Sequence, residues 1–168
     1  LDSSQWYHKY TDYVIERGLM NGMSQEKFAP NGILTRGQLV TILHRLAGSP
    51  TPTGASPFTD VKEGSYYYKA VLWAVENSIT SGATETTFVP DATCTRSQIV
   101  TFLYRMEKSP EATAENPFTD VKAGAFYENA VLWAVKENIT TGATATTFDP
   151  AGDCTRGQIV TFLYRSMK

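Results

Sequence analysis

Three arginines stand at the same place in a short motif that recurs every sixty residues. The motif is written "LTRGQLV", "CTRSQIV" and "CTRGQIV", and its arginines are Arg36, Arg96 and Arg156. A threonine followed three residues later by a glutamine is the capping-box pattern that begins a helix, so each arginine is predicted at the first helical position. A cation there opposes the helix dipole by about 0.3–1 kcal/mol. Because the arginine recurs at this position in all three repeats despite the cost, it indicates a chemical purpose.

The beginning of a helix is a place where anions bind. Its free backbone N–H groups favour negative charge, and the planar guanidinium fork can hold a carboxylate or a phosphate through two hydrogen bonds. The motif therefore predicts an anion site in each repeat, and Arg96→Ala is expected to cost only about 0.5 kcal/mol of stability, as a surface substitution does. An internal salt bridge to Asp60 or Asp120 explains the arginines equally well, and the two interpretations are compatible.

The sixty-residue period organises the whole chain of 168 residues. Repeat 1 is assigned to residues 1–50, repeat 2 to residues 51–110 and repeat 3 to residues 111–168. Segments rich in Pro, Ser and Thr, at 47–57 and 107–117, are predicted to be the loops that join them. The segment "PFTDVK" opens repeats 2 and 3, and its counterpart in repeat 1 falls before residue 1. Repeat 1 is therefore expected to be truncated at its N-terminal side.

Two helices are predicted in each repeat, so the fold class is all-α. The first helix covers "SYYYKAVLWAVEN" in repeat 2, residues 65–77, where apolar residues recur at helical spacing. It stops at Gly18, Ser78 and Asn138 in the three repeats, and the apolar residue after each predicts a Schellman ending. The second helix begins at the arginine motif. Neither helix pair can bury its apolar face alone, so the repeats are predicted to pack into one body.

Composition narrows the range of functions. The net charge of −2 argues against nucleic-acid binding, and no apolar run approaches the roughly 18 residues of a membrane span. Cys94 and Cys154 align with Leu34 and are expected to be buried free thiols, although a disulfide is allowed if their Cα atoms lie within about 7 Å. His8 and His44 belong to no recurring catalytic constellation. We therefore expect no enzymatic activity, no cofactor and no metal.

The ordered motifs resemble the S-layer homology (SLH) module. The resemblance rests on the F-x-D opening, an aromatic pair, a glycine after the first helix, an F-x-P turn and the T-R helix start, and it covers essentially the whole chain as three tandem copies. It implies three two-helix repeats packed as a pseudo-threefold, three-pronged single body. It also implies an extracellular place at the cell surface, in the S-layer or cell wall, where such triplets anchor proteins to secondary cell-wall polysaccharides that are commonly pyruvylated.

The resemblance also implies which residues bind the ligand: the T-R arginine, the F-x-D aspartate, a tryptophan of the first helix and a loop glycine. In this sequence they are Arg36, Arg96, Arg156, Asp60, Asp120, Trp73, Trp133, Gly22, Gly82 and Gly142. Repeat 1 departs from the pattern with Tyr13 in place of tryptophan, and glutamine replaces the acidic residue usual after the arginine in all three copies. The groove of repeat 1 is the one expected to be incomplete.

Residue chemistry and resemblance together favour non-covalent anchoring of a bacterial surface protein to the cell wall through an anionic polysaccharide, which is expected to be pyruvylated. Arginine suits the carboxylate of a pyruvate ketal, and an aromatic ring face suits the sugar ring. The alternative is a structural module that self-associates into a surface lattice. In both cases we expect no nucleic-acid partner and no membrane insertion, and the isolated fragment is expected to be a monomer.

Overall fold

A computed structural model describes residues 4–22 and 27–168, and within them the chain forms six α-helices and no β-strand. The helices are α1 (His8–Glu16), α2 (Arg36–Leu46), α3 (Tyr68–Glu76), α4 (Arg96–Met106), α5 (Glu128–Lys136) and α6 (Arg156–Ser166). Each repeat contributes two of them, which confirms the predicted all-α fold. The first helix of repeat 2 begins at residue 68 rather than 65, because residues 66 and 67 form a turn.

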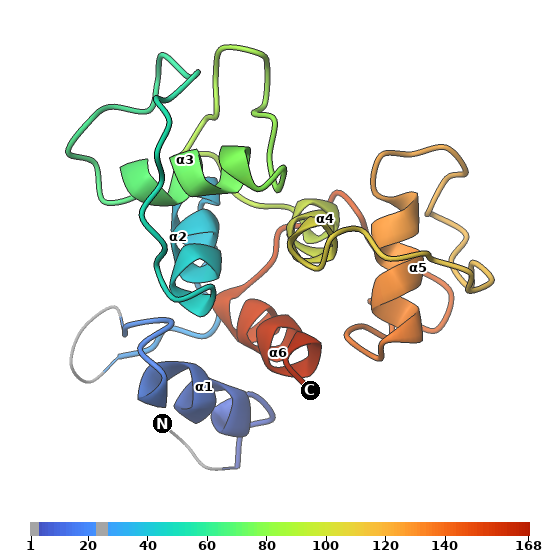
Figure 1. Ribbon diagram of the computed structural model, residues 1–168. Coiled ribbons are helices and arrows are strands. Elements are labelled where there is room, and N and C mark those ends of the chain that lie inside the picture. Colours follow the sequence, from blue (N-terminus) through green and yellow to red (C-terminus); the bar gives the residue numbers. More distant parts are fainter. Residues whose placement is uncertain (1–3, 23–26) are drawn as a thin grey trace.

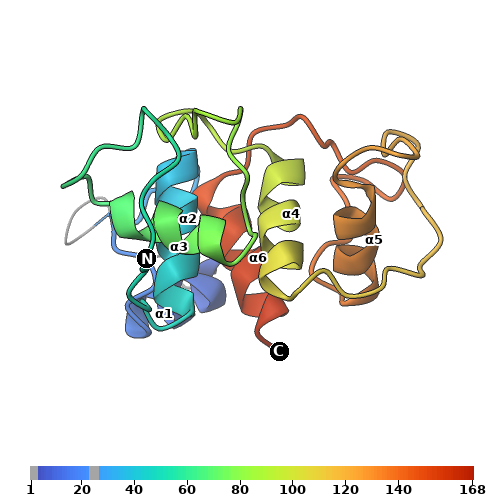
Figure 2. The same cartoon turned by 45° about the horizontal axis from the view of Figure 1, so that its top comes forward.

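The second helices lie at the centre of the molecule and the first helices lie outside them. In Figure 1, α2, α4 and α6 surround the middle, and α1, α3 and α5 stand further out. The turned view places α5 on the outer side of α4 (Figure 2). The principal helix contacts join α2 to α3, α4 to α5 and α6 to α1, so each outer helix packs on the second helix of the preceding repeat. The repeats thus form a closed, three-pronged circle, as the resemblance implies.

Local signals in the sequence determine where the helices begin and end. A threonine caps each second helix, and the predicted capping box with glutamine is complete in all three. The first helices end in Schellman turns: the Ile79 N–H donates to the Ala74 carbonyl oxygen at 2.8 Å. Gly18, Ser78 and Asn138 have φ angles of 64°, 58° and 57°. The predicted caps are therefore confirmed at both kinds of helix.

The segments that precede the second helices pair with one another across the repeats. Isolated antiparallel bridges join Ile33 to Thr155, Thr35 to Thr93 and Thr95 to Asp153. Between them, the Cys94 N–H donates to the Leu34 carbonyl oxygen at 3.0 Å, and the Cys154 N–H donates to the Cys94 carbonyl oxygen at 3.2 Å. Both cysteines are free and fully buried, as predicted. Burial raises the pKa of each thiol to about 12.

One hydrophobic core runs through all three repeats. The second helices bury seven or eight residues each, α3 and α5 bury five each, and α1 buries two. Because the apolar faces are covered by neighbouring repeats, the predicted packing into one body is confirmed. None of the helices in the described parts of the chain has the length and the apolar run needed to cross a membrane.

Candidate anion-binding grooves

Each motif arginine reaches from its own helix to the F-x-P turn of a neighbouring repeat. The bonds run from Nε of Arg36, Arg96 and Arg156 to the carbonyl oxygens of Phe88, Phe148 and Phe28, at 2.8, 2.8 and 2.9 Å. Repeat 1 thus holds repeat 2, repeat 2 holds repeat 3, and repeat 3 holds repeat 1. The arginines therefore connect the repeats, and this structural role accompanies any role in binding.

The backbone N–H groups beside these arginines are not free. In α2 the N–H of Arg36 donates to the Ala92 carbonyl oxygen at 2.9 Å, and that of Gly37 donates to the Pro90 carbonyl oxygen at 2.8 Å. The third N–H of the helix is bonded to the threonine cap. The starts of α4 and α6 are bonded to neighbouring repeats in the same way. The prediction that free helix N–H groups form part of the anion site is therefore wrong, and of that predicted site only the guanidinium is left as a candidate.

The arginine side chains are part of the core. Arg36 and Arg96 are 5% exposed, and the Arg36 guanidinium carbon lies 4.7 Å from the centroid of the Phe88 ring and 5.6 Å from that of Phe102. Burial lowers the pKa of Arg36, but a guanidinium remains protonated at neutral pH. Because removing such a side chain leaves both a void and an unpaired carbonyl oxygen, the predicted cost of about 0.5 kcal/mol is too low.

Asp60 and Asp120 hold the turns that the arginines contact. The Asp60 carboxylate accepts hydrogen bonds from the N–H of Phe88 at 2.9 Å and of Val89 at 2.7 Å, and Asp120 binds the corresponding N–H groups of repeat 3. The residue held by Asp60 is the one whose carbonyl oxygen accepts from Arg36. Among the described residues, the ion pair found within 4.0 Å does not involve the motif arginines. A direct salt bridge between a motif arginine and Asp60 or Asp120 is therefore not formed. Instead, each aspartate holds the turn whose phenylalanine carbonyl oxygen accepts a hydrogen bond from the arginine.

Groove 2 is the hollow that Arg36 shares with the loop and second helix of repeat 2. It has a volume of about 500 Å³, and its lining includes Arg36, Gly82, Gln98, Arg105 and Phe126. All three repeats contribute, because Arg36 comes from repeat 1 and Phe126 from repeat 3. Two guanidinium groups and an aromatic ring around one cavity are suited to a ligand that combines negative charge with a ring.

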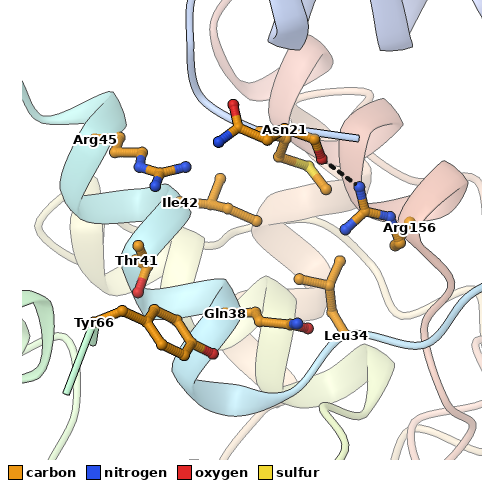
Figure 3. Close-up of a pocket in the computed structure, with 9 residues that line it drawn as sticks. Asn21, Leu34, Gln38, Thr41, Ile42, Arg45, Tyr66 and Arg156 are labelled. Atoms are coloured by element: carbon orange, nitrogen blue, oxygen red, sulfur yellow. Dashed lines mark hydrogen bonds between the residues drawn. The ribbon is translucent and has the colours of Figure 1, made fainter. Parts of the chain in front are cut away.

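Groove 1 is the equivalent hollow beside the loop and second helix of repeat 1 (Figure 3). Its lining includes Asn21, Gln38, Arg45, Tyr66 and Arg156, and its volume is about 100 Å³. In the close-up, the Arg156 guanidinium points at the main chain of Asn21, where its Nη2 donates to the carbonyl oxygen at 2.7 Å. The two grooves therefore contain the same kinds of residue around cavities of different size.

The tryptophans that were expected to face a sugar lie in the core. Trp73 is 6% exposed and Trp133 is 5% exposed. Their rings pack on His44 and Tyr104, with centroids 5.3 and 5.7 Å apart. A sugar could stack on either tryptophan only by displacing these neighbours. In this structure they support the outer helices rather than present an open ring face.

Other aromatic rings are open to solvent at the grooves. Trp6, Tyr66 and Phe126 occupy one position of the repeat and are 60%, 63% and 65% exposed. Tyr66 lines groove 1 and Phe126 lines groove 2. The sequence patterns did not single out Tyr66, so this role was missed. The signal that could have found it is an aromatic residue whose identity changes from copy to copy while its position does not.

A second set of arginines was also missed by sequence reasoning, although it shows the same sixty-residue period. Arg45, Arg105 and Arg165 lie near the ends of the second helices, and Nη1 of each donates to a main-chain carbonyl oxygen after a Schellman turn. The acceptors are Leu19, Ile79 and Ile139, at 3.3, 3.2 and 3.2 Å. Arg45 lines groove 1 and Arg105 lines groove 2, so each of these grooves has two cations.

The predicted loop glycines have a structural reason to be glycine. Gly82 and Gly142 have φ angles of 95° and 94°, and a Cβ atom on either would lie 2.5 Å from a ring carbon of Phe58 or Phe118. Gly82 also lines groove 2. Gly22 is exposed at the equivalent point of repeat 1. The first two glycines therefore fix the loop, and Gly82 additionally borders the cavity.

Three helical repeats closed into a circle, with candidate sites at the junctions between them, define a repeat-built binding module. The chain belongs to the S-layer homology family: the S-layer homology domain matches residues 1–40, 57–100 and 117–160. These are the three tandem repeats identified from the sixty-residue period. Membership of this family places the chain at the cell surface.

Relatives show the same kind of segment within longer chains. The chain is 25% identical to an amylopullulanase of Thermoanaerobacterium thermosulfurigenes over 95% of its length, 22% identical to an S-layer protein of Bacillus thuringiensis subsp. finitimus over 99%, and 24% identical to a cellulosome-anchoring protein of Acetivibrio thermocellus over 84%. It spans 9%, 21% and 33% of the lengths of these relatives. The similarity therefore concerns one part of each relative.

Proposed function

We propose that this chain anchors a surface protein to the bacterial cell wall by binding, non-covalently, an anionic and pyruvylated secondary cell-wall polysaccharide. Relatives named as a cellulosome-anchoring protein and an S-layer protein support a role at the wall. The amylopullulanase has a similar segment in a chain named for an enzyme. We infer that this chain supplies attachment, without catalysis of its own, as a monomeric module.

The observation that carries the proposal is the guanidinium of Arg36 in groove 2. The side chain is 5% exposed and lines a cavity of about 500 Å³, and no described carboxylate lies within 4.0 Å of its guanidinium. A buried charge without a paired counter-charge is costly. A carboxylate in the cavity would supply that counter-charge. A pyruvate ketal holds such a carboxylate rigidly on a sugar ring.

The rest of groove 2 fits the sugar. The exposed ring of Phe126 can stack on a sugar face, and Arg105 provides a second cation across the cavity. Gly82 lets the ligand approach the main chain. We assign Asp60 and Trp73 to positioning, since Asp60 holds the F-x-P turn and Trp73 supports α3. Asp120, Trp133 and Gly142 have the same parts in repeat 3.

Co-sedimentation with purified wall sacculi tests the function. We expect the chain to pellet with sacculi whose polymer has pyruvate ketals, to stay in solution after hydrofluoric acid removes the polymer, and to bind weakly after mild acid removes only the ketals. Undiminished binding after ketal removal would contradict the pyruvylated ligand. Sedimentation of the chain without sacculi would favour self-assembly into a lattice.

Paired variants connect this function to the grooves. Arg36→Gln with Arg96→Gln should weaken binding to sacculi by about tenfold to a hundredfold for each arginine, because each loses a charge-assisted bond of about 1.5–3 kcal/mol. Arg17→Gln is the matched control, since Arg17 lies over the Tyr13 ring and lines neither groove 1 nor groove 2. If the double variant and the control bind equally well, the grooves are not the site.

A further inference from the structure

Cys94 and Cys154 lie opposite each other in neighbouring repeats. The antiparallel bridge between Thr95 and Asp153 sets the register, so the two cysteines, one residue along each segment, face each other. The hydrogen bond of 3.2 Å from the Cys154 N–H to the Cys94 carbonyl oxygen belongs to this register. Residues that lie directly opposite in an antiparallel pair send their side chains to the same face. The two thiols therefore point into the same part of the core, where both are fully buried.

The backbone spacing of this pair suits a disulfide. Directly opposed residues of a hydrogen-bonded antiparallel pair have Cα atoms about 5.5 Å apart. A disulfide needs a Cα separation of about 4.4–6.8 Å, and about 5.5–6 Å is the commonest value. The register of the two segments therefore meets the condition of about 7 Å that the sequence set for a disulfide.

The equivalent residue of repeat 1 has no sulfur. Leu34 faces Cys94 in the same kind of register, because an antiparallel bridge joins Thr35 to Thr93. The Cys94 N–H donates to the Leu34 carbonyl oxygen at 3.0 Å, and Leu34 is buried as the cysteines are. A disulfide can therefore join repeats 2 and 3 only, and Leu34 marks the place where a matched pair can be built.

We infer that Cys94 and Cys154 form a disulfide that joins and stabilises repeats 2 and 3 when the chain folds in oxidising surroundings. The cell surface, where this family is found, is a place in which disulfides form and persist. The two cysteines are sixty residues apart in the sequence, and a cross-link over a loop of this length restricts the unfolded chain. The inference goes beyond wall binding and does not depend on it.

The bond has to form before the core closes. In the folded dithiol both thiols are fully buried, and burial raises the pKa of each to about 12, so little of the reactive thiolate is present. In the open chain, one thiolate attacks a small disulfide such as oxidised glutathione, and a molecule of reduced glutathione leaves. The second cysteine attacks the mixed disulfide and releases another. Two protein thiols are thus oxidised, and one glutathione disulfide is reduced to two thiols that take up the two protons.

Oxidative refolding of the intact chain tests the inference. The chain is reduced and unfolded, refolded with oxidised and reduced glutathione, then unfolded again and alkylated. We expect a monomer that takes up no alkyl group and that gives, on digestion, a peptide pair linked through Cys94 and Cys154. Cys154→Val is the control and should give no linked pair. Alkylation of both thiols in the refolded wild type, or links only between chains, overturns the inference.

Thermal melting provides a second readout. The oxidised chain should melt about 5–15 °C above the reduced chain, whereas Cys154→Val should melt at one temperature under both conditions. Leu34→Cys combined with Cys154→Val moves the pair to repeats 1 and 2, and it should form the link in the same refolding experiment. Equal melting temperatures of the oxidised and reduced wild type would overturn the inference that the link stabilises the fold.

Discussion

The second helices and the first helices are similar in length but differ in how they are capped and how much they bury. Each second helix begins with a complete capping box, buries seven or eight residues and brings an arginine to a neighbouring repeat. Each first helix begins without a side-chain cap, and its buried residues fall from five in α3 and α5 to two in α1. The centre is therefore built almost identically three times, whereas the outer layer varies.

The variation is concentrated where the circle closes. On α4 and α5 the contact is between Tyr104 and the buried Trp133, but on α6 and α1 it is between Tyr164 and the half-buried Tyr13, with centroids 4.9 Å apart. Lys9 lies 5.3 Å from the centroid of the Tyr164 ring. The contact between α6 and α1 therefore buries less apolar surface, and it has an edge-on aromatic pair with a lysine nearby. We expect the circle to open there first.

The largest effect is expected from isolating one repeat. Residues 57–108 contain α3 and α4, whose main partners, α2 and α5, lie outside the fragment. The fragment should lose cooperative folding completely, as followed by far-ultraviolet circular dichroism on heating. Residues 30–80, which retain the contacting pair α2 and α3, are the control and should keep more helix in the cold. A cooperative thermal transition of 57–108 would show that a repeat folds alone.

A smaller effect separates a well-buried outer helix from the closing one. Trp133→Ala should lower the free energy of unfolding by about 3–5 kcal/mol, as large buried side chains do. Tyr13→Ala, at the equivalent position, should cost about 1–2 kcal/mol because Tyr13 is only partly buried. Denaturant titration of both variants measures the difference. Equal losses would mean that α1 is held as firmly as α5.

A smaller difference in stability is expected between the two sets of arginines. Arg96→Ala should cost about 2 kcal/mol, because it leaves the buried Phe148 carbonyl oxygen without its donor. Arg105→Ala should cost about 0.5–1 kcal/mol, because its bond to the Ile79 carbonyl oxygen is only part-buried and 3.2 Å long. Both values come from chemical unfolding without ligand. A cost near zero for Arg96→Ala would mean that the motif arginines contribute no more to the free energy of unfolding than ordinary surface residues do.

The smallest effect concerns the turn held by Asp120. Burial raises the pKa of this carboxyl, but hydrogen bonds from Phe148 and Asp149 and the charge of Arg96 outweigh it, so the pKa lies below its usual 3.8. A lowered pKa in the folded state contributes stability above the unfolded pKa, and this contribution is lost as the pH falls through the folded pKa. Asp120→Asn should therefore melt slightly below the wild type at neutral pH, and the gap should close below about pH 4. A gap that widens on acidification contradicts this.

Local features of this fold could be predicted, and non-local ones could not. The capping boxes and Schellman turns depend on residues three to five apart, so their residues alone indicated them. The pairing of α3 with α2 rather than with α4 depends on which apolar faces meet in space, and the sixty-residue period does not specify it. The buried thiols were predictable because Leu34 stands at their position.

The features of the candidate site also divide into those that the sequence could predict and those that it could not. The motif arginines were found from their repetition, but the bonds that occupy the helix N–H groups come from main-chain carbonyl oxygens, which leave no mark in the side-chain pattern. For the same reason the contact between Arg156 and the main chain of Asn21 could not be foreseen. Trp73 was assigned by residue type and Tyr66 was not singled out, and only the folded arrangement shows that Trp73 is covered and Tyr66 is open.

A crystal structure of the chain with a methyl hexopyranoside that bears a pyruvate ketal tests the groove assignment most directly. We expect a carboxylate oxygen at about 3 Å from a nitrogen of the Arg36 guanidinium, the distance of a charge-assisted hydrogen bond, with the sugar beside the exposed ring of Phe126. Ligand bound elsewhere, without contact to the Arg36 guanidinium, would contradict the assignment of groove 2 as the wall-binding site.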